Sequence, residues 1–269
     1  MAHTMFDKKI YSDAERIQRV WDIIEIKNVM ALHIYYHCYA RQIEELEDIW
    51  VQKPENKKTA SFGQSRGYML GYDKIMQAYG INNLNNQKKA LAEAIANDPT
   101  IEDCEDNLGL GQSFVHAITT PYIELAGDGQ TAQGVWYTPG HTSGSDRHGY
   151  MYEKYFIDFI KEDGEWKIWH LFVGTDFSTP PGEGFGGPTE LEREKNPPPP
   201  GQGFPGGPPP GGGNKEPDPY YFSCDAYTMK FNYCHQKPLP KPYWTFSETR
   251  SYGPDGEEGF SWDMVYGGK

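Results

Sequence analysis

One histidine of this sequence stands where its side chain could move a proton. His116 lies in the stretch SFVHAITTPYIEL, whose alternating polarity predicts a β-strand. In a strand, Phe114, His116 and Ile118 share one face, so His116 points into the protein if that face is the concave one. A neutral imidazole can accept and return a proton near neutral pH. The alternative is a structural histidine that is hydrogen-bonded to a backbone carbonyl.

Two further histidines, His33 and His37, are four residues apart in a segment that predicts a helix. This spacing occurs in metal sites. No HExxH motif and no third ligand accompany the pair, so the pattern favours surface or interface histidines, and we expect no metal site. The four cysteines are too few and too scattered for a disulfide framework.

The elements that must position these side chains follow from periodicity. Residues 13–50 predict two or three helices, with Asp13 able to cap the first one, and residues 71–95 are helical again. Residues 57–70 between them resemble a short hairpin.

The second half of the domain has the period of strands. Residues 113–125 predict one strand, 126–129 a turn and 130–140 the next strand, and 149–177 predict a third and a fourth strand around the turn Glu162-Asp163-Gly164. Helices followed by an antiparallel meander indicate the α+β class. We expect a cone-shaped, curved antiparallel sheet packed on the N-terminal helices.

Several stretches carry a family resemblance. The segments DGQTAQGVWY and KEDGEWKIWHL, with IEELEDIW, GYDKI and TTPYIEL before them, resemble the SnoaL-like branch of the nuclear transport factor 2-like superfamily over about residues 15–177. That branch includes scytalone and bile-acid dehydratases, polyketide cyclases and ketosteroid isomerase. The resemblance implies a cone-shaped domain that uses neither a metal nor an organic cofactor. The family also includes plain binding and assembly domains, so the fold alone does not establish catalysis.

The resemblance suggests catalytic roles for two residues. His116 occupies the place of a dehydratase histidine and would move the proton. Tyr36 matches a tyrosine on the first helix of these enzymes, where a phenol would stabilise a developing oxyanion. The alternative for Tyr36 is an aromatic side chain that fills the seam between helix and sheet.

Two more residues would assist. Arg41 stands where bile-acid-type dehydratases have an aspartate; it would bind a substrate carboxylate, phenolate or enolate, or pair with Glu44 at the surface. His170 falls where many family members have a histidine. Strand alternation places Trp166, Ile168 and His170 on one face, which points either into the cone or to the sheet surface.

Apolar and aromatic side chains would wall the pocket or simply pack the core. The candidates are Phe62, Tyr68, Met69, Trp136, Tyr137, Tyr152 and Tyr155.

The composition divides the chain into three parts. Residues 1–178 form the expected domain, and residues 179–219 are a connector too rich in proline and glycine to form a packed core. Residues 220–269 are strongly aromatic but short and broken by prolines. We expect them to be an arm that packs on the domain or on a neighbouring subunit.

The charge excludes some partners. A formal net charge of −13 argues against nucleic acid and against an anionic membrane surface. No apolar run is long enough to cross a bilayer and the N-terminal segment has no apolar region of a signal peptide, so we expect a cytoplasmic protein. Together with the resemblance, these features suggest a homo-oligomeric lyase, a dimer or trimer, acting on a small hydrophobic or aromatic molecule. The alternatives are an isomerase or cyclase, or a non-catalytic binding or assembly module.

Overall fold

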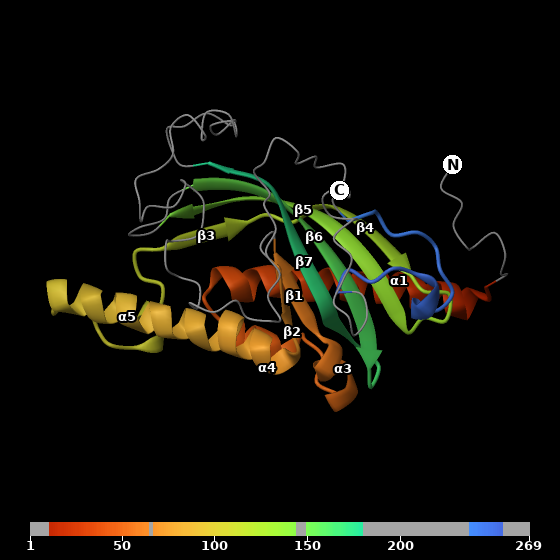
Figure 1. The fold of residues 1–269 in the computed structure, drawn as a ribbon, viewed down its shortest axis with the longest axis horizontal. Helices are drawn as coiled ribbons and strands as arrows, with labels where there is room; N and C mark the ends of the chain where they lie inside the picture. The colour runs from red at the N-terminus through yellow and green to blue at the C-terminus, as the bar shows by residue number, and fades with distance from the viewer. Residues whose placement is uncertain (1–10, 65–66, 144–148, 180–236, 255–269) are drawn as a thin grey trace.

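The computed structural model describes residues 11–64, 67–143, 149–179 and 237–254. Helices from the first part of the chain pack against one curved, seven-stranded sheet (Figure 1). The predicted α+β class is therefore confirmed. The expected connector after Thr179, which is the last residue of a strand, lies outside the described residues, as do residues 220–236 and 255–269 of the expected arm.

The helices occupy most of the first hundred residues. They are α1 (Asp13–Cys38), α2 (Gln42–Asp48), α3 (Pro54–Thr59), α4 (Tyr72–Ile75), the π-helical turn η2 (Met76–Ile81) and α5 (Asn82–Asn97), with 3-10 turns η3 (Glu105–Asn107) and η5 (Phe246–Glu248). The cap of α1 is Ser12 rather than Asp13: the Ser12 hydroxyl accepts from the Glu15 backbone N–H at 3.3 Å. The Glu15 side chain accepts in turn from the Ser12 backbone N–H, so the S-D-A-E sequence forms a capping box.

The strands make one mixed sheet. They are β1 (Ser61–Gln64), β2 (Gly67–Leu70), β3 (Ser113–His116), β4 (Thr119–Leu125), β5 (Thr131–Ser143), β6 (Gly149–Glu162) and β7 (Glu165–Thr179). Their order is β2-β1-β7-β6-β5-β3, and β4 also pairs with β5. All pairs of these strands are antiparallel except β1 with β7, which is parallel, so the expected curved antiparallel sheet is confirmed apart from this one junction.

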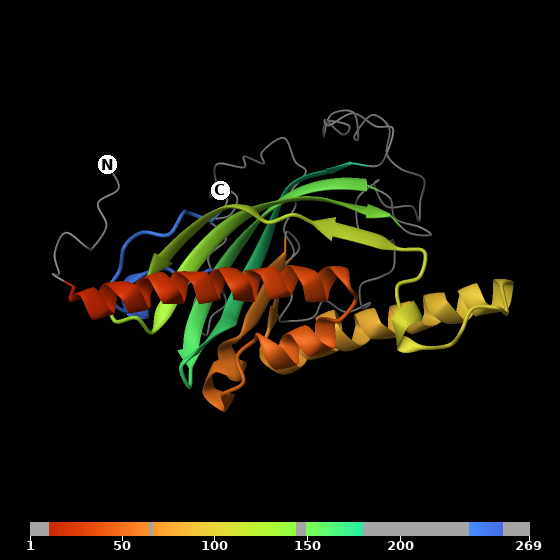
Figure 2. The ribbon, with the colours of Figure 1, turned by 180° about the vertical axis from the view of Figure 1, so that it is seen from behind.

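The sheet arches over α1. Figure 2 shows this helix lying across the strands on one side of the sheet, which we call the inner face. The main core fills the space between the helices and the inner face. Its largest fully buried side chains include Trp50, Trp136, Phe159 and Met30. Burying such side chains stabilises the fold by roughly 1.5–3 kcal/mol each.

The single strand expected over residues 113–125 is interrupted. It forms β3 and β4, both paired with β5, and the register shifts between Thr119 and Tyr122. Thr120 has a φ of +52°, a conformation that a β-branched residue adopts only under constraint. The alternation predicted for His116 nevertheless holds in β3, because His116 is buried whereas Val115 is exposed.

A bulge in β7 reverses the predicted orientation of His170. Asp158 of β6 pairs with His170 while the next residue, Phe159, pairs with Ile168, so Trp169 has no partner of its own. Ile168 and Leu171 both belong to the inner core, which strict alternation would not allow. His170 therefore lies on the outer face of the sheet, and the prediction that it shares a face with Ile168 is wrong.

Residues 237–254, which we call the arm segment, pack on that outer face. Tyr252 is almost fully buried against Phe156 of β6, and its hydroxyl donates to the Pro238 carbonyl at 2.8 Å. The backbone N–H groups of Gly127 and Asp128, in the β4–β5 turn, donate to carbonyls of the arm at 2.9 and 3.0 Å. Paired backbone and buried rings fix this segment on its own domain.

Candidate active site

A cluster of histidine and tyrosine side chains lies between α1 and the inner face of the sheet. His116, on β3, is 7% exposed, and its ring meets the ring of His37 edge-on with centroids 4.9 Å apart. His33 lies one helical turn from His37, with the ring centroids 6.1 Å apart. The three imidazoles come from two elements that are distant in sequence, so only the tertiary fold assembles them.

A buried carboxylate organises the helical side of this cluster. Glu45 of α2 has no exposed surface, and its Oε1 accepts from the Trp50 indole N–H at 2.9 Å. The same oxygen lies 2.8 Å from His33 Nδ1, and Oε2 accepts from the Tyr79 hydroxyl at 2.7 Å. The Tyr79 oxygen lies 2.9 Å from His37 Nδ1. A buried carboxylate that accepts several hydrogen bonds is satisfied where an isolated one would be very costly.

These contacts fix the tautomers of two histidines. A carboxylate only accepts, so His33 must donate from Nδ1. The single O–H group of Tyr79 already donates its hydrogen bond to Glu45. His37 must therefore also donate, from Nδ1 to the phenol oxygen. In the neutral ring of His37 the lone pair then resides on Nε2, which is the atom available to take a proton.

Burial keeps the two best-placed imidazoles neutral. It lowers the pKa of His116 to about 4, with the charges of His33 and His141 acting in the same direction. Burial, followed by the charges of His116 and His33, lowers the pKa of His37 to about 3. At neutral pH both rings are therefore proton acceptors.

Two phenols face the same cluster and stay protonated. The Tyr155 hydroxyl lies 3.5 Å from His116 Nδ1, a long contact, and Glu153 Oε2 lies 3.7 Å from the same nitrogen. Burial, and then the charge of Glu153, raises the pKa of Tyr155 well above its usual value. Burial and Glu45 do the same to the pKa of Tyr79. The site thus combines neutral imidazoles with one phenol, Tyr155, that can donate a hydrogen bond, because the Tyr79 hydroxyl already donates to Glu45.

Thr138 adds a buried hydroxyl group to the inner face. It is fully buried, and its Oγ1 has no hydrogen-bond partner among the residues that the structure describes. In the register of the sheet, Thr138 pairs with Glu153, and Gly140, two residues along β5, pairs with His116. These side chains share the inner face, so the Thr138 hydroxyl is a polar group on the same side of the sheet as His116.

The structure separates the other predicted catalytic residues from His116. The Tyr36 hydroxyl donates to Asp48 at 3.0 Å, and this bond, with burial as the smaller cause, raises the pKa of Tyr36. The Arg41 guanidinium lies within 4 Å of the carboxylates of Glu44, Glu105 and Asp106. Within the described part of the chain, neither side chain forms a hydrogen bond or an ion pair with His116.

The predicted wall residues divide between the two faces. Phe62 and Trp136 belong to the inner core, where the Phe62 ring lies 5.0 Å from that of Tyr79, and Met69 packs against this core. Tyr68 belongs instead to the cluster under the arm segment, and Tyr152 is 38% exposed.

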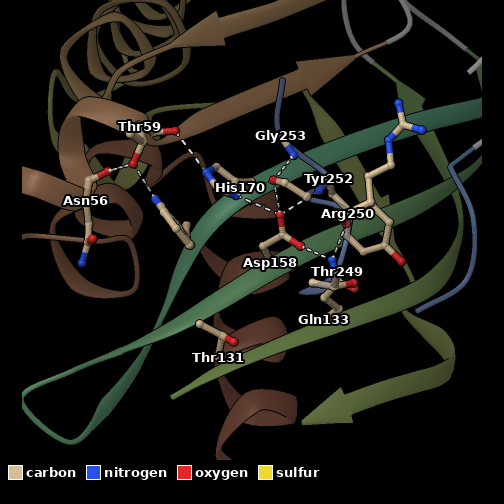
Figure 3. Close-up of polar contacts among 12 residues, drawn as sticks. Asn56, Thr59, Thr131, Gln133, Asp158, His170, Thr249, Arg250, Tyr252 and Gly253 are labelled. Atoms are coloured by element: carbon tan, nitrogen blue, oxygen red, sulfur yellow. Dashed lines mark hydrogen bonds and ion pairs between the residues drawn. The ribbon is translucent and has the colours of Figure 1, made fainter. Parts of the chain in front are cut away.

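His170 forms a different constellation on the outer face (Figure 3). Its Nδ1 lies 2.8 Å from Asp158 Oδ2 and 3.1 Å from Ser251 Oγ, and its Nε2 lies 3.1 Å from the Thr59 carbonyl oxygen. In a nucleophilic triad the serine and the acid contact opposite nitrogens of the imidazole. Here both lie on one nitrogen and a carbonyl occupies the other, so the group is built to hold the arm rather than to attack a substrate.

The Asp158 carboxylate accepts further hydrogen bonds, one of them from the arm segment. Its Oδ2 also accepts from the Tyr252 backbone N–H at 2.7 Å, and its Oδ1 accepts from Gln133 at 2.7 Å (Figure 3). A Cβ atom at Gly253 would lie 2.9 Å from the His170 ring, so the close approach of the arm requires a glycine at this position.

Sequence reasoning missed the helical half of the inner cluster. His33 and His37 were expected at a surface or interface, yet His33 is buried and both face the core side of α1. The signal was present: Ile26, Met30, His33 and His37 follow one another at steps of four, three and four residues, so both histidines continue the buried stripe. The described residues hold no group of three or more potential ligands placed to bind a metal ion.

Comparison with known proteins identifies the family of the domain. The family model of the SnoaL-like domain matches residues 18–171, more than half of the 269 residues. No curated protein matches the chain. Within the described residues, no helix has the length and apolar character needed to cross a membrane.

Several solved structures are similar to the chain. A proposed scytalone dehydratase of Novosphingobium aromaticivorans has 14% identity and a TM-score of 0.43, over 63% of this chain and 99% of that one. A nuclear transport factor 2-like protein with a cystatin-like fold from the same organism has 14% identity and a TM-score of 0.42, over 60% and 86%. A hexachlorocyclohexane dehydrochlorinase of Novosphingobium barchaimii has 16% identity and a TM-score of 0.41, over 63% and 97%. Similarity at this level carries no information about the reaction.

Proposed function

We propose that this chain, which belongs to the SnoaL-like domain family, is a cofactor-independent lyase that acts on a small hydrophobic, aromatic or polycyclic molecule. The reaction would be an elimination, either dehydratase-like or with release of a small carbonyl fragment such as formaldehyde. The observation that carries the proposal is the neutral His116 imidazole, buried on the inner face beside the protonated phenol of Tyr155.

His116 would perform both proton transfers. It takes the proton from a carbon next to a carbonyl group, the electron pair of that C–H bond forms the double bond, and the C–O bond to the hydroxyl breaks. The imidazolium then returns the same proton to the departing hydroxide, which leaves as water. Burial lowers the pKa of His116, and a low pKa makes the imidazolium a stronger acid in this second step. No other reagent is needed, because His116 returns to the leaving group the same proton that it removed from the carbon.

Tyr155 and Thr138 would hold the substrate oxygen. A carbonyl oxygen gains negative charge when the neighbouring carbon loses its proton, and preorganised hydroxyl donors stabilise that charge. Tyr155 is the phenol nearest to His116 Nδ1, and the Thr138 hydroxyl has no other partner among the described residues. In this proposal Tyr155 takes the role that was expected for Tyr36, whose hydroxyl is engaged by Asp48.

Two other functions use the same side chains. An isomerase or cyclase would return the proton to another carbon, so that water or a carbonyl fragment would not appear among the products. A non-catalytic binding or assembly module is favoured by one observation: the cluster's own rings contact one another at 4.9 to 6.4 Å and so occupy much of the space around His116.

The test is proton exchange and product analysis in D₂O. Aromatic and polycyclic β-hydroxy ketones are incubated with the protein, and NMR follows loss of the C–H signal next to the carbonyl and appearance of the enone. Elimination predicts both changes, and an isomerase predicts exchange without an enone. Failure of every member of the panel to exchange or to react would contradict the proposed substrate class. Tyr155→Phe should slow the reaction and Tyr36→Phe should not; the opposite result would return the oxygen-binding role to Tyr36.

A further inference from the structure

Helix α1 carries a second apolar stripe on the side that faces away from the sheet. Its members, which include the C-cap residue Tyr39 directly after the helix, are between 42% and 70% exposed: Ile17, Val20, Trp21, Ile24, Leu32, Tyr35 and Tyr39. Figure 2 shows the helix across the front of the molecule, with no other described element over it. A surface helix normally places charged and polar residues on this side, so the stripe calls for a partner.

The stripe has the spacing of a helix-pairing seam. Its central positions are separated by four, three, four, three and four residues: Ile17, Trp21, Ile24, Asn28, Ala31 and Tyr35. Alternating steps of four and three keep side chains on one seam, which is the pattern by which two helices pack together. Asn28 is the polar member, and a single polar residue in such a seam fixes the register of the pair.

We propose that this outer stripe of α1 is the interface between two copies of the chain, with the two α1 helices antiparallel about a two-fold axis. A two-fold interface joins the same surface on both copies and therefore needs a self-complementary stripe. An axis that passes between Ile24 and Asn28 sets the large Trp21 opposite the small Ala31 of the second copy. The same axis sets Ile17 opposite Tyr35 and places the two Asn28 side chains close to the axis.

The stripe has the size and polarity that a dimer needs. Seven half-exposed side chains of about 100 Å² each approach the roughly 800 Å² per partner of a standard interface. None of the seam residues is charged, and the Trp21 indole N–H is already satisfied, because it donates to Glu25 Oε1 at 2.8 Å. The formal net charge of −13 opposes the alternative of an anionic membrane surface. This inference does not depend on the proposed function.

The first test is the mass of the full chain in solution at tens of micromolar, measured by sedimentation. The wild type should have twice the chain mass of 30.6 kDa. The double variant Trp21→Glu, Ile24→Glu should have the mass of one chain and an unchanged far-ultraviolet circular dichroism spectrum. Lys89→Glu on α5, whose side chain is 78% exposed, is the matched control and should remain dimeric. A wild-type mass of one chain, or a double variant that stays dimeric, would overturn the proposal.

The second test is covalent and reports the orientation. Ile17 and Tyr35 are 18 residues apart, about 27 Å along one helix, so cysteines at both positions can join only between copies. Mild oxidation of the Ile17→Cys, Tyr35→Cys double variant should give disulfide-linked dimers in clear excess over the wild type and over either single variant. No excess would exclude the antiparallel register. Binding of monomeric wild type to phosphatidylcholine vesicles would assign the stripe to a membrane instead.

Discussion

The Tyr79 hydroxyl lies 2.7 Å from the Oε2 atom of Glu45, a carboxylate with no exposed surface. The phenol therefore donates its one hydrogen bond to the carboxylate, and its oxygen can only accept a hydrogen bond from His37. One buried hydrogen bond on α2 thus decides which nitrogen of an imidazole on α1 is basic. This relationship connects the packing of the helices to the chemistry that the inner cluster can perform.

The tautomer of His37 is the first consequence that can be measured. In the wild type at neutral pH, ¹⁵N NMR of the imidazoles should show His37 protonated at Nδ1. Tyr79→Phe removes the acceptor for that proton, so the population should shift toward the Nε2-protonated form. Phe62→Leu, which changes a neighbouring ring but no hydrogen bond, is the control. An unchanged His37 spectrum in Tyr79→Phe would contradict the relay.

Glu45 should be among the most sensitive polar positions of the fold. Glu45→Gln replaces one acceptor oxygen with an amide that faces a donor, so we expect the free energy of unfolding to fall by about 1–3 kcal/mol. The neighbouring Glu44, whose side chain is 49% exposed, is the matched control, and Glu44→Gln should change stability by less than about 0.5 kcal/mol. Chemical denaturation measures both values. Equal effects would show that the buried network does not stabilise the fold.

The depressed histidine pKa values predict how stability depends on pH. His116 has a pKa of about 4 in the folded protein and about 6.5 as its ordinary value. As the pH falls from 6.5, His116 binds a proton in the unfolded chain but not in the folded protein. The free energy of unfolding therefore falls by about 1.4 kcal/mol per pH unit through this residue. The loss continues until the pH reaches about 4. The stabilising contribution is complete above pH 6.5.

Denaturation between pH 6.5 and about 5 tests this, because carboxylates titrate mainly below that range. His116→Gln should reduce the slope by about 1.4 kcal/mol per pH unit and leave the part due to His37, whose pKa is also lowered. A wild-type slope that persists in His116→Gln would assign it to other groups.

The arm segment should stabilise the whole domain. Tyr252 is 2% exposed and fills the outer cluster with Phe156 and Tyr68, so Tyr252→Ala should cost roughly 3–5 kcal/mol. Leu239, 62% exposed in the same segment, is the control, and Leu239→Ala should be nearly neutral. Thermal and chemical unfolding compare the two variants. Similar small effects in both would mean that the arm is dispensable for stability.

Much of the fold could be predicted from periodicity because local patterns specify local structure. The helices of the first half, the turn at residues 126–129 and the hairpin of β6 and β7 all follow from spacing and turn residues. The parallel pairing of β1 with β7 could not be predicted, since no local pattern records which distant strand becomes a neighbour. The bulge at Trp169 was equally hidden, and a single extra residue was enough to move His170 to the other face.

Only part of the candidate site could be predicted, because local patterns do not record contacts between residues that are distant in the sequence. The alternation around His116 correctly indicated an inward side chain. The network of Glu45, Tyr79 and His37 joins residues separated by up to 42 positions, and only the packed structure shows that they meet. The inward position of His37 was available from the spacing of the buried stripe on α1, whereas the engagement of Tyr36 by Asp48 was not.

The most direct test of the account is the rate of His116→Gln. The compound that the wild type converts fastest in the β-hydroxy ketone panel is assayed with both proteins in D₂O, and circular dichroism verifies that the variant is folded. If His116 moves the proton, kcat should fall by a factor on the order of 10²–10⁴, in both exchange and elimination. A folded His116→Gln variant that turns over within a few-fold of the wild type would contradict the account.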